Sequence, residues 1–282
     1  DDSYHKNDTL YPDAEIQKIK DLVKVGEETK VEYGWAIHLS YFWGASGTFD
    51  EKFERLMTKF QQLYDAGVRN FAMLNDDFGG GEYSEILRLL NKFDDEFIKT
   101  HDGCSNLVYC MKGYNKAWSG DGSELESLKQ LNETVYLYWT GDDVNAPITQ
   151  STVDFLKERT DGRIPVIWLN YPVNEHAKSG LFLGPINHYA RNDVTGLKGV
   201  VSNPSRYAEA NKVGLFQLAA LFWNNHGYEE QAETIWEESF KYLQPEVYES
   251  YLTIARNVAN CPNSTRVASF PESEYIKDEL AS

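Results

Sequence analysis

The stretch that decides the fold is an apolar run that ends in two acids. Residues 68–75 read VRNFAMLN, Asp76 and Asp77 follow, and residues 78–81 read FGGG. Residues 68–74 of this run predict a buried parallel strand. Two adjacent acids at its end repel each other, which raises the pKa of at least one and can keep one acid protonated near neutral pH. The pair can therefore supply a general acid and an ionised partner from one residue type.

Similar apolar runs recur on both sides of this stretch. Further strands are predicted at residues 31–39, 106–111, 135–139, 165–169 and 198–202. Patterns with one apolar face predict helices at residues 13–24, 49–64, 83–97 and 205–222. This alternation of strands and helices predicts an α/β protein whose parallel sheet is covered by helices.

Two architectures have this alternation. A doubly wound sheet carries a glycine-rich phosphate loop after its first strand, but neither GxGxxG nor GxxxxGK[ST] occurs in the sequence. A β/α barrel places its chemistry at the carboxyl ends of its strands. Polar and aromatic residues gather at five successive strand ends, at Asp76-Asp77, Tyr114, residues 139–142, residues 168–170 and residues 202–203. The sequence therefore predicts a (β/α)8 TIM-type barrel with one shared site.

The predicted barrel is incomplete, because about six of its eight βα units can be recognised. We expect the first two units to be absent from this chain and either cropped or supplied by a second chain. From about residue 227 the strand pattern ends, and residues 229–242 and 246–259 are typical of helices. The predicted domains are an N-terminally truncated catalytic barrel at 1–226 and a helical appendage at 227–282.

Composition excludes several classes of function. The net charge of −17 would repel a phosphate backbone, so we expect no nucleic-acid partner. The sequence has neither an apolar stretch of spanning length nor a basic amphipathic helix, so we expect no membrane insertion. It shows no targeting signal. Three cysteines without CxxC spacing, and histidines without HxH or HExxH spacing, predict no disulfide scaffold, no metal site and no cofactor.

Each candidate residue also has an ordinary structural interpretation. Asp76 and Asp77 could solvate a loop or cap a helix, although the apolar run before them and the glycines after them favour chemistry. The ligand spacing of an EF-hand is not met. Tyr114 is either a buried tyrosine or a donor to a developing charge. Asn203 fits a turn or an N-cap, and His38 either packs in the barrel or contacts a ligand.

Residues 168–175 read WLNYPVNE. The structural interpretation is a strand followed by a proline turn. The functional interpretation is an amide, Asn170, and a carboxylate, Glu175, that hold hydroxyl groups beside the Trp168 indole. The high aromatic content of 14% fits either a tyrosine-rich core or a cleft that stacks sugar-like ligands.

Together these residues resemble family 84 glycoside hydrolases, which include O-GlcNAcases and bacterial β-N-acetylglucosaminidases. The matching stretches keep their order and spacing at residues 35–38, 75–79, 110–118, 139–142, 168–173, 183–185 and 202–212. The resemblance implies retaining hydrolysis of β-linked N-acetylglucosamine, on a glycoprotein or a glycan. The 2-acetamido oxygen of the sugar attacks its own anomeric carbon and forms an oxazoline, so no enzyme nucleophile is needed.

The resemblance also implies residue roles. Asp76 would orient and polarise the acetamido N–H. Asp77 would protonate the leaving oxygen and then deprotonate the incoming water. Tyr114 would donate a hydrogen bond to the acetamido group. Trp168 would line the pocket for the acetyl group, and Thr140 would lie near this pocket. Asn170 and Asn203 would hold the sugar. Glu175 would bind the outer hydroxyls of the sugar.

This sequence departs from the family pattern in two respects. Glu175 stands where the family usually has Asp, so its carboxylate reaches one methylene further. The family's first two strand ends supply a glycine-aromatic segment and a lysine, and neither is in this chain, while residues 1–5 resemble the segment after the second strand. The resemblance favours a bacterial enzyme that is secreted. Two alternatives stay open: a non-catalytic carbohydrate-binding or interaction protein, and a half-enzyme that needs a second chain.

Overall fold

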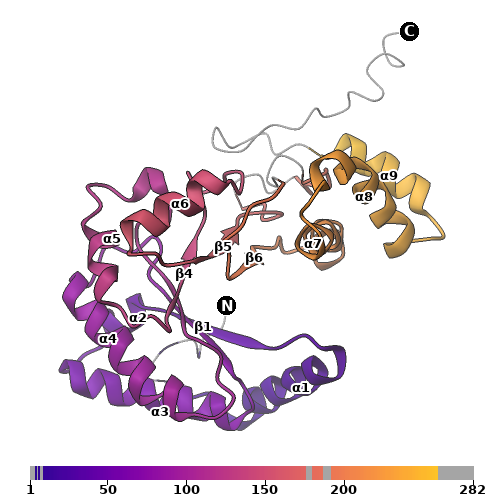
Figure 1. Ribbon diagram of the computed structural model, residues 1–282. Helices are drawn as coiled ribbons and strands as arrows, with labels where there is room; N and C mark the ends of the chain where they lie inside the picture. The colour runs from indigo at the N-terminus through magenta and orange to yellow at the C-terminus, as the bar shows by residue number, and fades with distance from the viewer. Residues whose placement is uncertain (1–3, 5, 7–8, 176–179, 187–191, 260–282) are drawn as a thin grey trace. The chain divides into compact units, whose positions relative to one another are not determined.

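The computed structural model describes residues 4, 6, 9–175, 180–186 and 192–259. Six parallel strands follow one another in chain order within the sheet (Figure 1). They are β1 (Gly34–His38), β2 (Asn70–Leu74), β3 (Val108–Cys110), β4 (Tyr136–Trp139), β5 (Pro165–Leu169) and β6 (Gly199–Ser202). Parallel strands in this order, with helices among them and after them, make an incomplete (β/α) barrel with C-terminal helices. The predicted fold class is confirmed, and every predicted strand lies within three residues of the observed bounds.

The helices follow the predicted pattern with three additions. The predicted ones are α1 (Asp13–Thr29), α3 (Phe49–Asp65), α4 (Tyr83–Glu96), α7 (Ala208–Trp223), α8 (Tyr228–Leu243) and α9 (Tyr248–Asn257). Sequence analysis missed α2 (Ser40–Gly44), α5 (Ser123–Ser127) and α6 (Gln150–Arg159), and the short 3-10 turns η1 (Ile98–Thr100), η2 (Lys116–Trp118) and η3 (Leu128–Gln130). Within the described residues between β5 and β6 no helix forms, so the alternation of strands and helices is not strict there.

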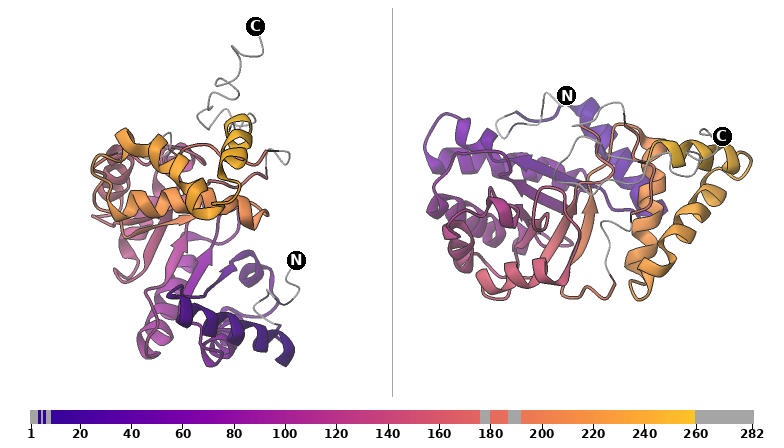
Figure 2. Two further views of the ribbon diagram at one scale, coloured as in Figure 1. Left: turned by 90° about the vertical axis from the view of Figure 1, so that its right-hand side faces the viewer. Right: turned by 90° about the horizontal axis from the view of Figure 1, so that it is seen from above.

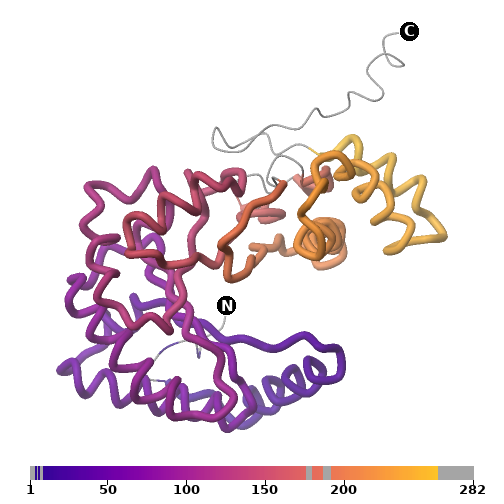
Figure 3. The backbone as a smooth tube through the Cα atoms, in the orientation of Figure 1, coloured from indigo at the N-terminus to yellow at the C-terminus, as the bar shows by residue number. Residues whose placement is uncertain are grey.

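Residue packing divides the chain into two compact units, which we describe separately. The first unit comprises Asp1–Tyr114, Ser119–Tyr138 and Glu158–Arg163, and the second comprises Asn115–Trp118, Trp139–Lys157 and Ile164–Ser282. Figure 3 traces the backbone through both. The domain boundary expected at residue 227 stays a prediction, and most of residues 1–5, together with residues 260–282, lies outside the described part.

The first unit is built on strands β1 to β3 and the start of β4. The register pairs His38 of β1 with Leu74 of β2, and Leu74 with Cys110 of β3, so these strands end at one level. Helices α3 and α4 pack through aromatic rings, with Phe60 and Phe93 at 4.5 Å between centroids and Phe71 of β2 at 5.1 Å from Phe60. These fully or nearly fully buried rings fix the strands that carry the candidate site.

The start of α3 is set by a capping box. The Thr48 side chain accepts the Glu51 backbone N–H, and the Glu51 carboxylate accepts the Thr48 backbone N–H at 2.7 Å. This exchange satisfies two backbone donors that would otherwise lack partners at the helix N-terminus. The hydrogen bonds that the Glu51 carboxylate accepts from the Thr48 backbone N–H and from the Thr48 hydroxyl lower the pKa of Glu51.

The second unit contains the parallel pair β5 and β6, with Leu169 of β5 paired with Ser202 of β6. Its helical part shares one core, formed by the buried residues Leu183, Val213, Trp236, Phe240 and Ala255. The Trp236 indole N–H donates to the Leu183 carbonyl oxygen at 2.6 Å, so this buried donor is satisfied. Figure 2 shows α7 to α9 in orange to yellow. In the part of the chain that is described, no helix is both long and apolar enough to cross a membrane.

Candidate active site

The acidic turn, which we define as Asp76 and Asp77, begins two residues beyond the end of β2. Asn75 continues the strand pairing, because its backbone N–H donates to the Cys110 carbonyl oxygen at 2.9 Å. Asp77 then adopts the left-handed region with φ 55°, which Asp and Asn enter at lower cost than most residues. The chain thus turns sharply where the buried strand ends, and this turn places one acid half-buried and the next exposed.

Asp76 is a half-buried carboxylate with unused hydrogen-bonding capacity. Its Oδ1 atom is buried and has no hydrogen-bond partner among the described residues. Burial is the main cause that raises the pKa of Asp76, and the neighbouring Asp77 charge adds the least. The expected rise in one pKa of the pair is therefore present, but desolvation rather than mutual repulsion dominates it.

His38 is a member of this site that sequence analysis left open. It ends β1, and its Nε2 atom lies 2.8 Å from the Asp76 carbonyl oxygen and 4.0 Å from Asp76 Oδ1. Its Nδ1 atom lies 2.7 Å from the Ser40 hydroxyl oxygen. The sequence signal was its position at a strand end, but only the β1–β2 register shows that this end lies beside Asp76.

Tyr114 reaches the acidic turn from the segment after β3. Its hydroxyl donates to Asp77 Oδ1 at 3.3 Å. The tyrosine is 7% exposed, and burial followed by the Asp77 charge raises its pKa well above the ordinary value. Tyr114 is therefore buried, as one interpretation expects, and its hydroxyl donates to Asp77. Its role as a donor to a developing charge stays a prediction.

Glu124 fixes the segment that carries Tyr114. The carboxylate accepts the backbone N–H groups of Lys112 and Gly113 at 3.0 and 2.7 Å. It is 5% exposed, and burial raises its pKa while these two hydrogen bonds oppose the rise. Sequence analysis missed Glu124, because a glutamate in the polar stretch of α5 carries no signal that distinguishes it from a surface residue.

The second unit carries the amide cluster, which we define as Asn170 and Asn203 together with Trp168. Asn170 Oδ1 accepts from the Trp168 indole N–H at 3.0 Å and from Asn203 Nδ2 at 2.9 Å. Asn170 Nδ2 donates to the Val144 carbonyl oxygen at 2.5 Å, and Asn145 Nδ2 donates to the Asn170 carbonyl oxygen at 2.8 Å. The Asn170 oxygen is thus a shared acceptor that ties the ends of β5 and β6 together.

Thr140 and Glu175 were also predicted as site residues, but the hydrogen bonds described for the amide cluster do not include them. Thr140 is 4% exposed and donates to the Asp143 carbonyl oxygen at 2.7 Å, so its hydroxyl shapes the turn after β4. Glu175 is exposed in the loop after β5. The structure therefore brings together Asp76, Asp77 and Tyr114 in the first unit, and Trp168, Asn170 and Asn203 in the second.

No group of three or more histidine, cysteine or carboxylate side chains in the described ranges could hold a metal ion. Cys104 and Cys110 are free thiols, and burial raises the pKa of both. Cys261 lies outside the described residues.

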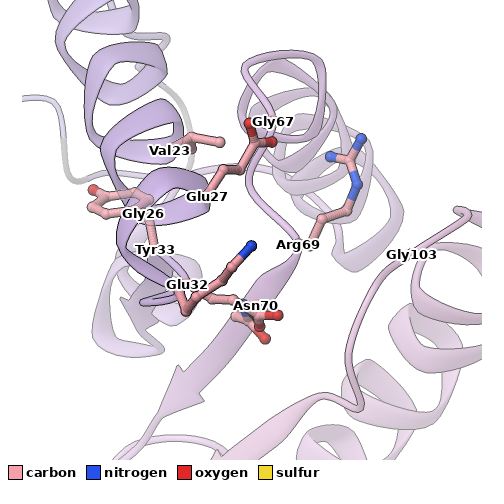
Figure 4. A pocket seen from close by; sticks show the side chains of 10 residues that line it. Val23, Gly26, Glu27, Glu32, Tyr33, Gly67, Arg69, Asn70 and Gly103 are labelled. Carbon is pink, nitrogen blue, oxygen red and sulfur yellow. Dashed lines mark hydrogen bonds between the residues drawn. The ribbon is translucent and has the colours of Figure 1, made fainter.

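A pocket of about 440 Å³ opens in the first unit at the other end of the strands (Figure 4). It is lined by Glu32 and Tyr33, which precede β1, by Arg69 and Asn70 at the start of β2, and by the α1 residue Glu27. These are the amino-terminal ends of parallel strands, whereas barrel chemistry occurs at the carboxyl-terminal ends. The pocket is therefore separate from the acidic turn.

A sequence model of β-N-acetylglucosaminidases matches residues 1–256, which is most of the chain. The chain belongs to this β-N-acetylglucosaminidase family. Proteins named protein O-GlcNAcase from Rattus norvegicus and Mus musculus are each 25% identical to it over 232 residues, which cover 77% of this chain and 25% of theirs. The resemblance to family 84 glycoside hydrolases is confirmed.

Solved structures agree with this β-N-acetylglucosaminidase assignment. CpGH84D superposes with a TM-score of 0.89 at 30% identity, over 99% of this chain and 47% of its own. CpGH84B superposes with a TM-score of 0.88 at 28% identity, over 99% of this chain and 50% of its own. A mutant O-GlcNAc hydrolase of Thermobaculum terrenum shares the fold at 20% identity, with a TM-score of 0.80 over 100% of this chain and 63% of its own. The chain thus spans a quarter of these curated relatives and roughly half to two thirds of these solved ones.

Proposed function

We propose that the protein is a retaining β-N-acetylglucosaminidase that works by substrate-assisted catalysis. The observation that carries the proposal is the acidic turn. Asp76 is half-buried and its Oδ1 atom has no hydrogen-bond partner within the described part of the chain, while the exposed neighbour Asp77 accepts a hydrogen bond from Tyr114. Two carboxylates in different environments suit two roles in one reaction. Membership of the family supports N-acetylglucosamine as the sugar.

In the first step the acetamido oxygen of the bound sugar attacks the anomeric carbon. The bond to the leaving oxygen breaks, and Asp77 acts as the general acid that donates a proton to that oxygen. Asp76 Oδ1 accepts the acetamido N–H, so the positive charge that develops on the amide is stabilised by the carboxylate. The product of this step is an oxazoline bound to the enzyme, with no bond between sugar and protein.

In the second step water attacks the anomeric carbon from the face that the leaving group vacated. Asp77, now ionised, takes the proton from this water, and the bond from the anomeric carbon to the oxazoline oxygen breaks. The acetamido group is restored, and two inversions at one carbon give net retention. Tyr114, which keeps its proton, donates to the acetamido group during the attack.

The amide cluster suits sugar binding rather than proton transfer. Because Asn170 already bonds Trp168, Asn203 and Val144, it can hold the indole and the second amide in fixed orientations. Among the described residues Asn170 Nδ2 donates one hydrogen bond, so its second N–H can meet a sugar hydroxyl. Trp168 offers an apolar face to an acetyl group or a ring. Glu175 is assigned to the outer hydroxyls, where its exposed carboxylate can move to meet them.

The test is hydrolysis of an aryl β-N-acetylglucosaminide by the full-length protein. We expect turnover, with the β-anomer of N-acetylglucosamine as the first product by NMR. Release of the α-anomer would reject retention. Saccharide binding without turnover would instead support the non-catalytic alternative.

A further inference from the structure

The His38 side chain is held from three directions. Its Nδ1 atom lies 2.7 Å from Ser40 Oγ and 3.3 Å from the Ser40 backbone nitrogen, and its Nε2 atom lies 2.8 Å from the Asp76 carbonyl oxygen. The Phe78 ring packs against the imidazole edge to face, with the ring centroids 5.9 Å apart. These contacts determine both the rotamer and the ring orientation of His38.

These contacts determine which ring nitrogen carries the proton. A carbonyl oxygen can only accept, so Nε2 carries a hydrogen and donates it to Asp76. The Ser40 backbone N–H can only donate, so Nδ1 is the acceptor and also receives the Ser40 hydroxyl hydrogen. The structure therefore assigns the neutral Nε2–H tautomer to His38. Because both nitrogens are engaged, His38 is not available as a general base.

The carbonyl that His38 holds belongs to the peptide group joining Asp76 to Asp77. The orientation of this peptide fixes ψ of Asp76 and φ of Asp77. The φ of Asp77 is 55°, a left-handed conformation that costs free energy for any residue with a Cβ atom. A hydrogen bond to this one carbonyl thus opposes rotation of the peptide toward an ordinary conformation.

Two consequences follow for the carboxylates. The left-handed turn directs Asp77 to the Tyr114 hydroxyl, 3.3 Å away. Because the His38 N–H is used by the backbone carbonyl, it does not satisfy Asp76 Oδ1, which stays at 4.0 Å and without a hydrogen-bond partner among the described residues. Asp76 Oδ1 is thus left for a donor on the substrate.

We propose that His38 is a positioning residue for the acidic turn: its Nε2–H holds the Asp76–Asp77 peptide, and with it the left-handed conformation that sets the directions of both carboxylates. This inference rests on the proposed function for its kinetic consequence. Its structural content, that the ring holds the peptide, stands independently of any activity.

The experiment compares two nearly isosteric replacements in the full-length protein. In His38→Gln the side-chain amide can place an N–H where Nε2–H stood, whereas His38→Met has similar length and no donor. We expect His38→Met to lower kcat on an aryl N-acetylglucosaminide by about 10- to 100-fold, because a small misplacement of a reacting group has this effect. We expect His38→Gln to recover most of the loss, with similar KM in both variants.

Ser40→Ala is the matched control. It removes the hydroxyl from Nδ1 but keeps the backbone N–H that specifies the tautomer, so kcat should change much less than in His38→Met. Thermal unfolding of all three variants separates loss of positioning from loss of folding. Equal losses of kcat in the Gln and Met variants, at unchanged stability, would overturn the proposal.

A second measurement does not depend on turnover. Nitrogen-15 NMR of the imidazole should report the Nε2–H tautomer, and a crystal structure of His38→Met should show the Asp76–Asp77 peptide rotated and φ of Asp77 changed. A parent protein without turnover would sink the proposed function while these measurements still test the inference. An unchanged positive φ at Asp77 in His38→Met, or an Nδ1–H tautomer in the parent, would refute the positioning role.

Discussion

Two regions lie at the carboxyl ends of parallel strands: the acidic turn after β2, and the amide cluster after β5 and β6. They differ in whether their polar side-chain atoms have hydrogen-bond partners. In the amide cluster, Asn170 Oδ1 accepts two hydrogen bonds and the side-chain nitrogen donates a third. In the acidic turn, Asp76 Oδ1 is buried without a hydrogen-bond partner among the described residues, and burial raises the pKa of its carboxyl group.

The difference teaches what each region can contribute. Satisfied polar groups hold their geometry and cost little to bury, which suits a surface that orients a ligand. A half-buried carboxylate with one unpaired oxygen destabilises the fold, and such a cost is typical of groups that meet their partner only when substrate binds. Substitutions in the acidic turn should therefore lower kcat. Substitutions in the amide cluster should weaken substrate binding and lower the free energy of unfolding.

The largest effect is expected for Asp77→Asn. Without an acid at this position, kcat on a substrate with a poor leaving group should fall by about 10²- to 10⁴-fold, the usual contribution of general acid–base catalysis. Steady-state kinetics with poor and good leaving groups should show a smaller loss for the good one. Asp161→Asn is the control, because Asp161 is also exposed and left-handed, with φ 58°. Equal effects of the two substitutions would contradict the assigned role.

Asp76→Asn should separate activity from stability. We expect kcat to fall by about 100-fold, because the amide cannot stabilise positive charge as a carboxylate does. Folding raises the pKa of Asp76, so the folded state binds this proton more tightly than the unfolded state. Between the two pKa values the free energy of unfolding therefore falls as pH rises, and above the folded pKa the ionised carboxylate remains destabilising.

The pH dependence of the free energy of unfolding gives a second measurement for Asp76→Asn. At pH 7 Asp76→Asn should unfold at a higher temperature than the parent protein, and the advantage should vanish below the unfolded pKa of about 3.9. Thermal unfolding across pH checks both statements. A variant that is less stable than the parent at pH 7 would show that the carboxylate is well solvated or paired, contrary to the account.

Tyr114→Phe removes only the hydroxyl that donates to Asp77. Hydrogen bonds to charged groups contribute about 1.5–3 kcal/mol, so we expect kcat to fall by about 10- to 100-fold. Tyr136→Phe is the control, since Tyr136 begins β4 and lies at the other end of its strand. If the two variants retained the same activity, the Tyr114 hydroxyl would have no part in the reaction.

Asn170→Ala tests the amide cluster. The substitution leaves the Trp168 and Asn203 donors without their shared acceptor, so we expect a loss of about 1–3 kcal/mol in the free energy of unfolding. KM should rise by about 10-fold with a smaller change in kcat. Asn225→Ala, which removes a single hydrogen bond to the Val194 carbonyl oxygen, should do less in both measurements. A loss confined to kcat would place Asn170 with the chemistry instead.

The last comparison concerns stability alone and lies in the glycine loop that follows the acidic turn. A Cβ atom on Gly81 would lie 2.9 Å from the Trp43 ring, and its φ is 86°, so Gly81→Ala should destabilise the protein by about 1–3 kcal/mol. Gly79→Ala meets no atom within 4 Å and should be tolerated. Chemical denaturation compares the two. Similar stability of both variants would mean that the loop relaxes freely.

Most of the fold could be predicted from the sequence because its strands are buried apolar runs. The predicted strand at residues 165–169 has the same bounds as β5, because this short apolar segment has clear ends. Helix α6 was missed because its sequence, QSTVDFLKER, buries only Thr152, Val153 and Leu156 and has little apolar periodicity. Helix α2 is too short for periodicity to be recognised. Helix α7 begins at Ala208, and the Ser205 hydroxyl before it donates to Asn211 Oδ1 within the helix.

The candidate site could be predicted in its members but not in its internal arrangement. The position of Asp76 and Asp77 at a strand end follows from local sequence, and their catalytic roles stay predictions. His38 and Glu124 act through backbone atoms of segments distant in the chain, so only the strand register and the packing of α5 show their partners. The dominant cause of the raised pKa of Asp76 is likewise burial, which local sequence does not measure.

The central claim is that the acetamido group of the substrate is the nucleophile, steered by Asp76. The most direct measurement is kcat/KM of the full-length protein on aryl N-acetylglucosaminides whose acetyl methyl carries none, one, two or three fluorines. Each fluorine weakens the carbonyl oxygen as a nucleophile, so the account predicts a steep, progressive fall across the series. A flat series would mean that the amide does not attack, and it would contradict the account.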